Sequence, residues 1–111
     1  MIESEQKNVA VIIPAFNEEN SVGNVIRDIP KELVNEIIVV NNNSNDRTRL
    51  SAERAGATVL DEKWQGYGYA CLKGIEHVRN LHPQPKIVVF LDADYWDYPD
   101  ENSSFKCNFN E

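Results

Sequence analysis

Several features that mark whole classes of protein are missing from this sequence. No apolar run approaches the roughly 20 residues needed to cross a bilayer, and the acidic start, Met1–Glu5, lacks the apolar stretch of a signal peptide. Two cysteines are too few for a disulfide scaffold, which fits a reducing cytosol. A net charge of −7 over 111 residues argues against a nucleic-acid groove, which needs a basic stripe. We therefore expect one small cytoplasmic domain with no membrane span and no nucleic-acid partner.

The negative charge is concentrated in one short segment. Residues 92–101 contain five Asp or Glu and no Lys or Arg, so they carry −5 of the net −7. A local cluster of carboxylates indicates either a cation site or a solvated acidic loop.

Four short apolar runs dominate the rest of the chain: residues 9–13, 37–40, 57–60 and 87–91. Three of the four are rich in β-branched residues, and none alternates apolar with polar positions. Continuous short runs are typical of strands buried on both faces of a parallel sheet.

Helical spacing separates these runs. One helix is expected after the possible N-cap residues Asn20 and Ser21 and ends at Pro30, a second covers residues 46–55, and a third covers residues 67–78. The order β-α-β-α-β-α-β predicts an α/β fold with a doubly wound, mainly parallel sheet in the strand order 3-2-1-4.

In such a sheet, ligands bind beyond the carboxyl ends of the strands. The four segments that follow the predicted strands are therefore expected to meet at one rim. They are residues 14–18, 41–46, 61–68 and 92–94, and all are polar.

The last of these segments offers two carboxylates one residue apart. Asp92 and Asp94 leave a buried strand on its alternating pattern, so they are expected to point the same way. Mg²⁺ or Mn²⁺ suits such a pair, because these ions often join one or two carboxylates to substrate phosphates. A lone D-x-D is also common in solvated loops, so the motif does not decide the matter by itself.

The other three segments each allow a structural and a functional interpretation. Asn17 and Glu18 suit either a ligand or a helix start, and the asparagines 41–43 suit either a turn or a nucleobase edge. Gly66 lets an anion approach the start of a helix. Neither G-x-G-x-x-G nor G-x-x-x-x-G-K-[ST] is present, which excludes the usual dinucleotide fingerprint and the P-loop.

Taken in order, four blocks resemble the family 2 glycosyltransferases. They match the family patterns V-I-I-P-A-Y/F-N-E-E, E-I-I-V-V-D-D/N-G-S-T-D-x-T, G-K-G-x-A-L-x-x-G and F-L-D-A-D. In this chain the blocks are Val11–Glu19, Glu36–Thr48, Gly66–Gly74 and Val89–Asp94. The closest likeness is to the dolichyl- or polyprenyl-phosphate sugar transferase branch.

The resemblance implies a GT-A-like, nucleotide-sugar-binding half-domain over residues 8–101, with irregular tails at 1–7 and 102–111. It implies that Glu18 and Asn41 contact the base or ribose, that Asp92 lies near the ribose and diphosphate, and that Asp94 binds the Mg²⁺ or Mn²⁺ cofactor. The donor-binding set implied by the family is Pro14, Ala15, Asn17, Glu18, Asn41, Asn43, Gly66, Asp92 and Asp94.

The reaction implied is inverting transfer of a sugar from a UDP- or GDP-sugar to a lipid-phosphate or glycan acceptor, as in cell-envelope glycan biosynthesis. The catalytic base is expected downstream of this chain. The implied location is cytoplasmic, with the inner face of the membrane as an alternative in the intact family.

Two departures from the family pattern are local. Asn41 stands where Asp is usual, which removes a charge-assisted hydrogen bond, and Tyr67 stands where Lys or Arg is frequent. A third is that the resemblance ends soon after Asp94, so a truncated, catalytically inactive nucleotide-binding module is the main alternative. Two other α/β families are alternatives. A receiver domain would need paired acids after its first strand, and a haloacid-dehalogenase-like phosphatase would carry its D-x-D after that strand, whereas here the D-x-D follows the fourth predicted strand.

One expectation concerns association. In the order 3-2-1-4, the strand over residues 87–91 lies at the sheet edge and is apolar on both faces. An uncovered apolar edge is a template for pairing with a second chain, so self-association through this strand is predicted.

Overall fold

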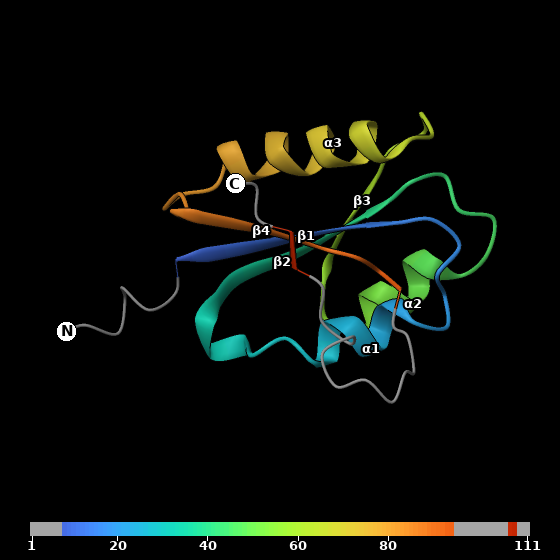
Figure 1. Ribbon diagram of the computed structural model, residues 1–111, viewed down its shortest axis with the longest axis horizontal. Helices are drawn as coiled ribbons and strands as arrows, with labels where there is room; N and C mark the ends of the chain where they lie inside the picture. Colours follow the sequence, from blue (N-terminus) through green and yellow to red (C-terminus); the bar gives the residue numbers. More distant parts are fainter. Residues whose placement is uncertain (1–7, 95–106, 109–111) are drawn as a thin grey trace.

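A computed structural model describes residues 8–94 and 107–108, which form one five-stranded sheet with helices on both faces (Figure 1). The strand order is β3-β2-β1-β4-β5, and the first four strands are parallel. The predicted parallel order 3-2-1-4 is confirmed. The elements are β1 (Val9–Ala15), α1 (Val22–Arg27), the 3-10 helix η2 (Lys31–Leu33), β2 (Val34–Asn41), α2 (Thr48–Arg54), β3 (Thr58–Asp61), α3 (Tyr67–Arg79), β4 (Ile87–Leu91) and β5 (Cys107–Asn108).

The two central strands form the core, as their unbroken apolar runs predict. Ile12, Ile13, Ile38 and Val39 are completely buried, because β1 and β2 have a strand on each side and a helix layer on each face. Successive side chains of a strand point to opposite faces. Accordingly, Ile13 and Val39 pack toward α1 and α2, whereas Ile12 and Ile38 pack toward α3.

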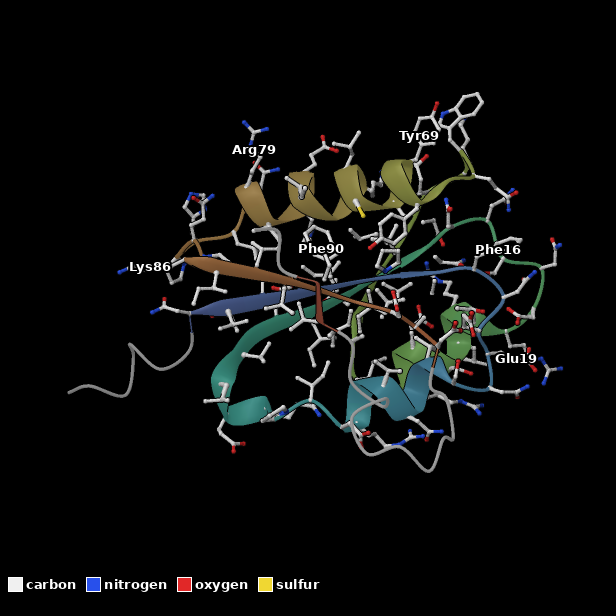
Figure 2. The ribbon with its side chains drawn as sticks, in the orientation of Figure 1. Phe16, Glu19, Tyr69, Arg79, Lys86 and Phe90 are labelled. Carbon is white, nitrogen blue, oxygen red and sulfur yellow. The ribbon has the colours of Figure 1, made fainter. Side chains whose placement is uncertain are left out.

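Among the described helices, only α3 covers this face of the sheet, and it does so with small residues (Figure 1, Figure 2). Ala70, Gly74 and Val78 are its buried positions. A Cβ on Gly74 would lie 2.6 Å from Cγ2 of Ile12, so this glycine lets the helix approach the sheet closely. The apolar stripe expected on this helix is wrong at two positions: Tyr67 and Ile75 belong to the expected stripe, but both are exposed.

Helices α1 and α2 cover the opposite face (Figure 1). Val22 and Ile26 of α1 are completely buried, as the spacing predicts. In α2 the buried positions are Thr48 and Ala52, one turn apart, whereas Leu50 is exposed. The apolar stripe expected on α2 is therefore wrong in one position: Thr48 is buried, and Leu50, which belongs to the expected stripe, is not.

The structure adds two elements that the sequence pattern did not indicate. The 3-10 helix η2 leads directly into β2, which begins at Val34 rather than Ile37. Cys107–Asn108 forms β5, antiparallel to β4, with pairs Leu91–Cys107 and Phe90–Asn108. The expectation of an irregular 102–111 tail is wrong for these two residues, and β4 is not an edge strand at its carboxyl end.

The parallel register fixes the position of the rim. Ala15 pairs with Asn41, and Asn41 with Asp61, so β1, β2 and β3 end side by side. The polar segments that follow them consequently leave the sheet at one edge. Within the described residues, no helix is long and apolar enough to cross a membrane.

Candidate functional site

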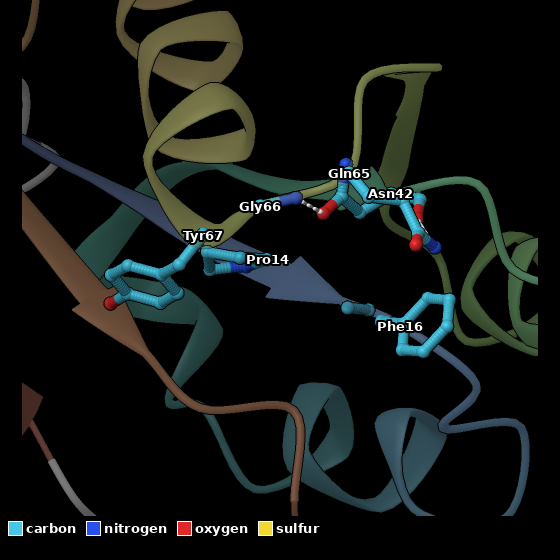
Figure 3. A pocket seen from close by; sticks show the side chains of 7 residues that line it. Pro14, Phe16, Asn42, Gln65, Gly66 and Tyr67 are labelled. Atoms are coloured by element: carbon cyan, nitrogen blue, oxygen red, sulfur yellow. Dashed lines mark hydrogen bonds between the residues drawn. The ribbon is translucent and has the colours of Figure 1, made fainter.

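A pocket of about 260 Å³ opens at this carboxyl edge, between the end of β1 and the start of α3 (Figure 3). The exposed rings of Phe16 and Tyr67 lie on opposite sides of it, with Pro14 between them. Its lining residues are Pro14, Ala15, Phe16, Asn42, Gln65, Gly66 and Tyr67.

Asn42 holds the floor of this pocket together. Its side chain is almost fully buried, and its Nδ2 donates to the carbonyl oxygens of Trp64 (2.7 Å) and Glu62 (3.2 Å). The backbone N–H of Gly66 donates to Asn42 Oδ1 at 2.9 Å (Figure 3). Asn42 therefore fixes the β3–α3 loop, and it also leaves the Gly66 N–H unavailable to a ligand.

Side chains also join the loop after β1 to the loop after β2. The backbone N–H of Asn17 donates to Ser44 Oγ at 2.9 Å, and that of Asn45 donates to Asn17 Oδ1 at 2.8 Å. Asn17 has a φ of 53°, a left-handed conformation that asparagine tolerates better than most residues. Its side-chain oxygen is used in bracing the two loops.

Thr48, completely buried, is the centre of a second set of contacts between these loops. Its Oγ1 accepts from the backbone N–H of Glu18 at 2.8 Å and donates to Asp46 Oδ1. Desolvation would raise the pKa of Asp46, but hydrogen bonds from the Thr48 hydroxyl and from the N–H groups of Thr48 and Glu19 outweigh it and lower that pKa. Asp46 is thus held as a carboxylate that accepts from both loops.

Glu18 faces the turn that follows β4. Its carboxyl group is within hydrogen-bonding reach of Asp94, and its Oε1 lies 2.9 Å from Ser21 Oγ. The pKa of Glu18 is raised to about 7, first by partial burial and then by the neighbouring Asp94, against the opposing effect of the Ser21 hydroxyl. The structure therefore brings together the first and fourth polar segments, as the topology predicts.

Asp92 acts electrostatically on Tyr67, which lines the pocket. Desolvation is the main cause that raises the pKa of Tyr67, with further contributions from Cys71 and from the negative charge of Asp92. Asp92 is exposed, whereas Asp94 is half-buried beside Glu18. The two aspartates of the D-x-D thus have different surroundings, one near the Tyr67 ring and one near a carboxyl partner.

The pair Glu18 and Asp94 fits a divalent cation that is shared with a ligand. No group of three or more His, Cys, Asp or Glu gathers in the described part of the chain, so a cage made of protein ligands alone is not formed there. Mg²⁺ and related hard cations commonly take one or two carboxylates and complete their shell with water and substrate phosphates. A cation would also relieve the contact between two acidic groups.

The remaining predicted residues occupy less direct positions. Asn41 Nδ2 donates to Asp61 Oδ1 at 3.0 Å, and its Oδ1 is buried with no hydrogen-bond partner among the described residues. Asn41 is not among the residues that line the pocket. Asn43 is exposed with a φ of 64°, which fits the turn interpretation. The predicted donor-binding set did not include four of the lining residues: Phe16, Asn42, Gln65 and Tyr67.

Comparison with known proteins shows the family of this chain. Residues 10–104 match the sequence model described as Glycosyl transferase family 2. The chain belongs to glycosyltransferase family 2. The resemblance recognised from the four sequence blocks is thereby confirmed.

Individual relatives of this family 2 chain include enzymes and solved structures. It is 36% identical over 95 residues to 4,4'-diaponeurosporenoate glycosyltransferase of Staphylococcus aureus, covering 79% of this chain and 24% of that enzyme. It superposes with a TM-score of 0.71 and 29% identity on glucosyl-3-phosphoglycerate synthase from Mycobacterium tuberculosis in complex with Mn²⁺, UDP and glucosyl-3-phosphoglycerate. That match covers 84% of this chain and 36% of the synthase, so the chain spans only about a third of it.

Proposed function

We propose that the carboxyl edge of the sheet binds a nucleotide sugar together with Mg²⁺ or Mn²⁺, and that the chain is the donor-binding part of an inverting glycosyltransferase. One observation carries this proposal. The pocket between Phe16 and Tyr67 opens on the same rim as the paired carboxyl groups of Glu18 and Asp94. The rim therefore offers an aromatic, partly apolar pocket beside a site for a cation.

The base and ribose fit the pocket. Aromatic rings favour stacking with planar groups, and Phe16 and Tyr67 expose their rings on its two sides. The family pattern assigns donor contacts to Pro14, Ala15, Asn17, Asn41, Asn43 and Gly66 as well. Of these, Pro14, Ala15 and Gly66 line the pocket, whereas Asn17 and Asn43 support the adjoining loop.

The diphosphate would lie between Asp92 and Asp94, with the cation held by Asp94. Glu18, in contact with Asp94, would orient that carboxylate and reach the ribose. Such a cation supplies Lewis-acid stabilisation of the charge that develops on a diphosphate leaving group. The chain's own contribution is to hold the two acidic groups at a fixed place next to the pocket.

The donor and the cation are supported by relatives. Glucosyl-3-phosphoglycerate synthase was solved with Mn²⁺, UDP-glucose and phosphoglyceric acid, and also with Mg²⁺ and UDP. We infer a UDP- or GDP-sugar as donor here, and transfer to a lipid-phosphate or glycan acceptor as the activity of the protein in which this donor-binding part works.

Calorimetric titration of the chain with UDP or GDP tests the proposal. We expect tighter binding with Mn²⁺ or Mg²⁺ than with EDTA, and loss of that difference in Asp94→Ala. Asp28→Ala is the matched control, because Asp28 is an exposed acid at the end of α1, outside the site residues. Equal affinity with and without the cation in the unmodified chain would contradict the proposal.

A further inference from the structure

We propose that Ser21 is a positioning residue for the cation-binding aspartate, and that its hydroxyl contributes to the cation-dependent part of nucleotide binding. The inference rests on the proposed function. It concerns a residue outside the predicted donor-binding set, at the start of α1.

The Ser21 hydroxyl reaches across the rim to the D-x-D turn. Its Oγ lies 2.8 Å from the carbonyl oxygen of Ala93, a residue 72 positions further along the chain, and 2.9 Å from Glu18 Oε1. Ala93 is buried and lies between Asp92 and Asp94. Fixing the Ala93 carbonyl therefore restrains the backbone that carries both carboxylates.

Ser21 occupies a helix start without serving as a conventional cap. It is the N-cap residue of α1, a position where a serine hydroxyl usually accepts from a backbone N–H in the first turn. Here the side chain makes no capping hydrogen bond. Its hydroxyl is directed to the D-x-D turn instead, while its backbone carbonyl accepts from the N–H groups of Asn24 and Val25.

The direction of the hydrogen bond follows from the partner. A carbonyl oxygen can only accept, so Ser21 must be the donor to Ala93, and its single hydroxyl proton is shared between Ala93 O and Glu18 Oε1. The backbone of Ser21 is fixed in turn by its N–H, which donates to the Glu18 carbonyl at 3.1 Å. Ser21 thereby joins the loop that carries Glu18 to the turn that carries Asp94, and these two acids are in contact.

A second serine provides a matched control. Ser51 Oγ donates to the carbonyl of Glu19 at 2.9 Å, so it also holds a backbone carbonyl of the β1–α1 loop. Both serines are partly buried, but Ser51 lies on α2 and does not reach the D-x-D turn. Ser21→Ala and Ser51→Ala delete the same group from comparable surroundings.

The decisive experiment titrates UDP into Ser21→Ala, Ser21→Thr and Ser51→Ala, each with Mn²⁺ and with EDTA. Loss of one hydrogen bond corresponds to about a three- to tenfold effect, so we expect the Mn²⁺-dependent gain in UDP affinity to fall by about that factor in Ser21→Ala. Ser21→Thr retains the hydroxyl and should restore the gain, and Ser51→Ala should leave it unchanged. If Ser21 had only a structural role, Ser21→Ala would lower the UDP affinity by the same factor with Mn²⁺ and with EDTA, which would contradict the inference.

A ligand-free measurement keeps this inference separate from the proposed function. In the NMR spectrum without UDP or Mn²⁺, Ser21→Ala should shift the Ala93 carbonyl carbon and speed amide exchange at Asp94, whereas Ser51→Ala should not. Unchanged signals at both positions would overturn the inference. If the signals shift but the unmodified chain binds no UDP, the proposed function fails while the positioning contact stands. If Asp94→Ala abolishes the Mn²⁺-dependent gain in UDP affinity and Ser21→Ala does not, the proposed function stands and the positioning role of Ser21 fails.

Discussion

The rim has two halves that are built differently. On one side, the loops after β1 and β2 are joined by side-chain hydrogen bonds centred on Asn17, Thr48 and Asp46. On the other side, the turn at Asp92–Asp94 is tied to the β1–α1 loop through the Ser21 hydroxyl and the contact between Glu18 and Asp94. The first half is held by neutral donors with neutral and charged acceptors, and the second includes a contact between two acids.

The two halves differ in what completes them: the geometry of the first is formed by the protein itself, and that of the second is completed by a ligand. Buried polar groups with their partners rigidify a structure. Because Thr48 is completely buried and both of its hydroxyl hydrogen bonds are made, we expect the first half to be set around it before any nucleotide arrives. The contact with Asp94 disfavours ionisation of Glu18, and an opposite charge removes that cost. We therefore expect the base side of the site to depend on the fold, and the diphosphate side to depend on the cation.

Breaking the braced half should give the largest effect. Thr48→Val keeps the side-chain shape but removes the acceptor for the Glu18 N–H and the donor to Asp46. Leaving buried groups unpaired should lower the free energy of unfolding by about 2–3 kcal/mol. Urea unfolding measures this, with Thr58→Val in β3 as the control that changes the same residue type at a half-buried strand position. Equal effects of the two substitutions would show that the bracing is not what Thr48 contributes.

A smaller loss is expected from Asn42→Ala, which removes the hydrogen bonds to Trp64, Glu62 and Gly66. The expected cost is about 1–2 kcal/mol in the free energy of unfolding. Because Asn42 shapes the pocket and not the cation site, UDP affinity should fall by a similar factor with Mn²⁺ and with EDTA. Asn35→Ala changes the same residue type at an exposed position near the start of β2, away from the rim, and should change neither quantity. If Asn42→Ala lost only the Mn²⁺-dependent gain in UDP affinity, the division of the rim into two independent halves would be contradicted.

The smallest effect is expected at the second half and concerns pH, because Glu18 is only partly buried and solvent screens its interactions. Glu18 has a pKa of about 7 in the fold and an ordinary value of 4.5, so between these values the folded chain binds more protons than the unfolded chain. Its contribution to stability is therefore complete below pH 4.5 and declines as the pH rises to about 7. Glu18→Gln should remove this decline, and Asp94→Asn should reduce it by removing one cause of the raised pKa. Unfolding curves across this range in metal-free buffer provide the check; an unaltered pH dependence in Glu18→Gln would contradict the assignment.

Much of the fold followed from the sequence because strand burial leaves a strong pattern. The runs that became β1, β2 and β4 are continuous and apolar, and the strands they form are covered on both faces. Boundaries were harder to predict. Strand β2 starts three residues early because Val34 pairs with Val9, a contact that depends on the neighbouring strand and not on local composition.

The site was predicted in part, and the three successive asparagines show why. Asn41 ends β2 and bonds across to β3, Asn42 is buried under the pocket, and Asn43 turns the chain with a positive φ. Their side chains are identical, so only the register of the strand end decides which one faces inward. The short β5 is similarly invisible to pattern analysis, because a two-residue strand is defined by its partner.

The most direct test of the account locates the cation on the rim. Mn²⁺ is paramagnetic and broadens the NMR signals of nearby nuclei, so a titration of the chain with Mn²⁺ and UDP maps both ligands at once. The account predicts selective broadening at Glu18, Ser21 and Asp94, and shifts caused by diamagnetic Mg²⁺ and UDP at Phe16, Asn42 and Tyr67. Broadening centred on another acidic group, such as Glu36 at the opposite end of β2, with the carboxyl edge unaffected, would contradict it.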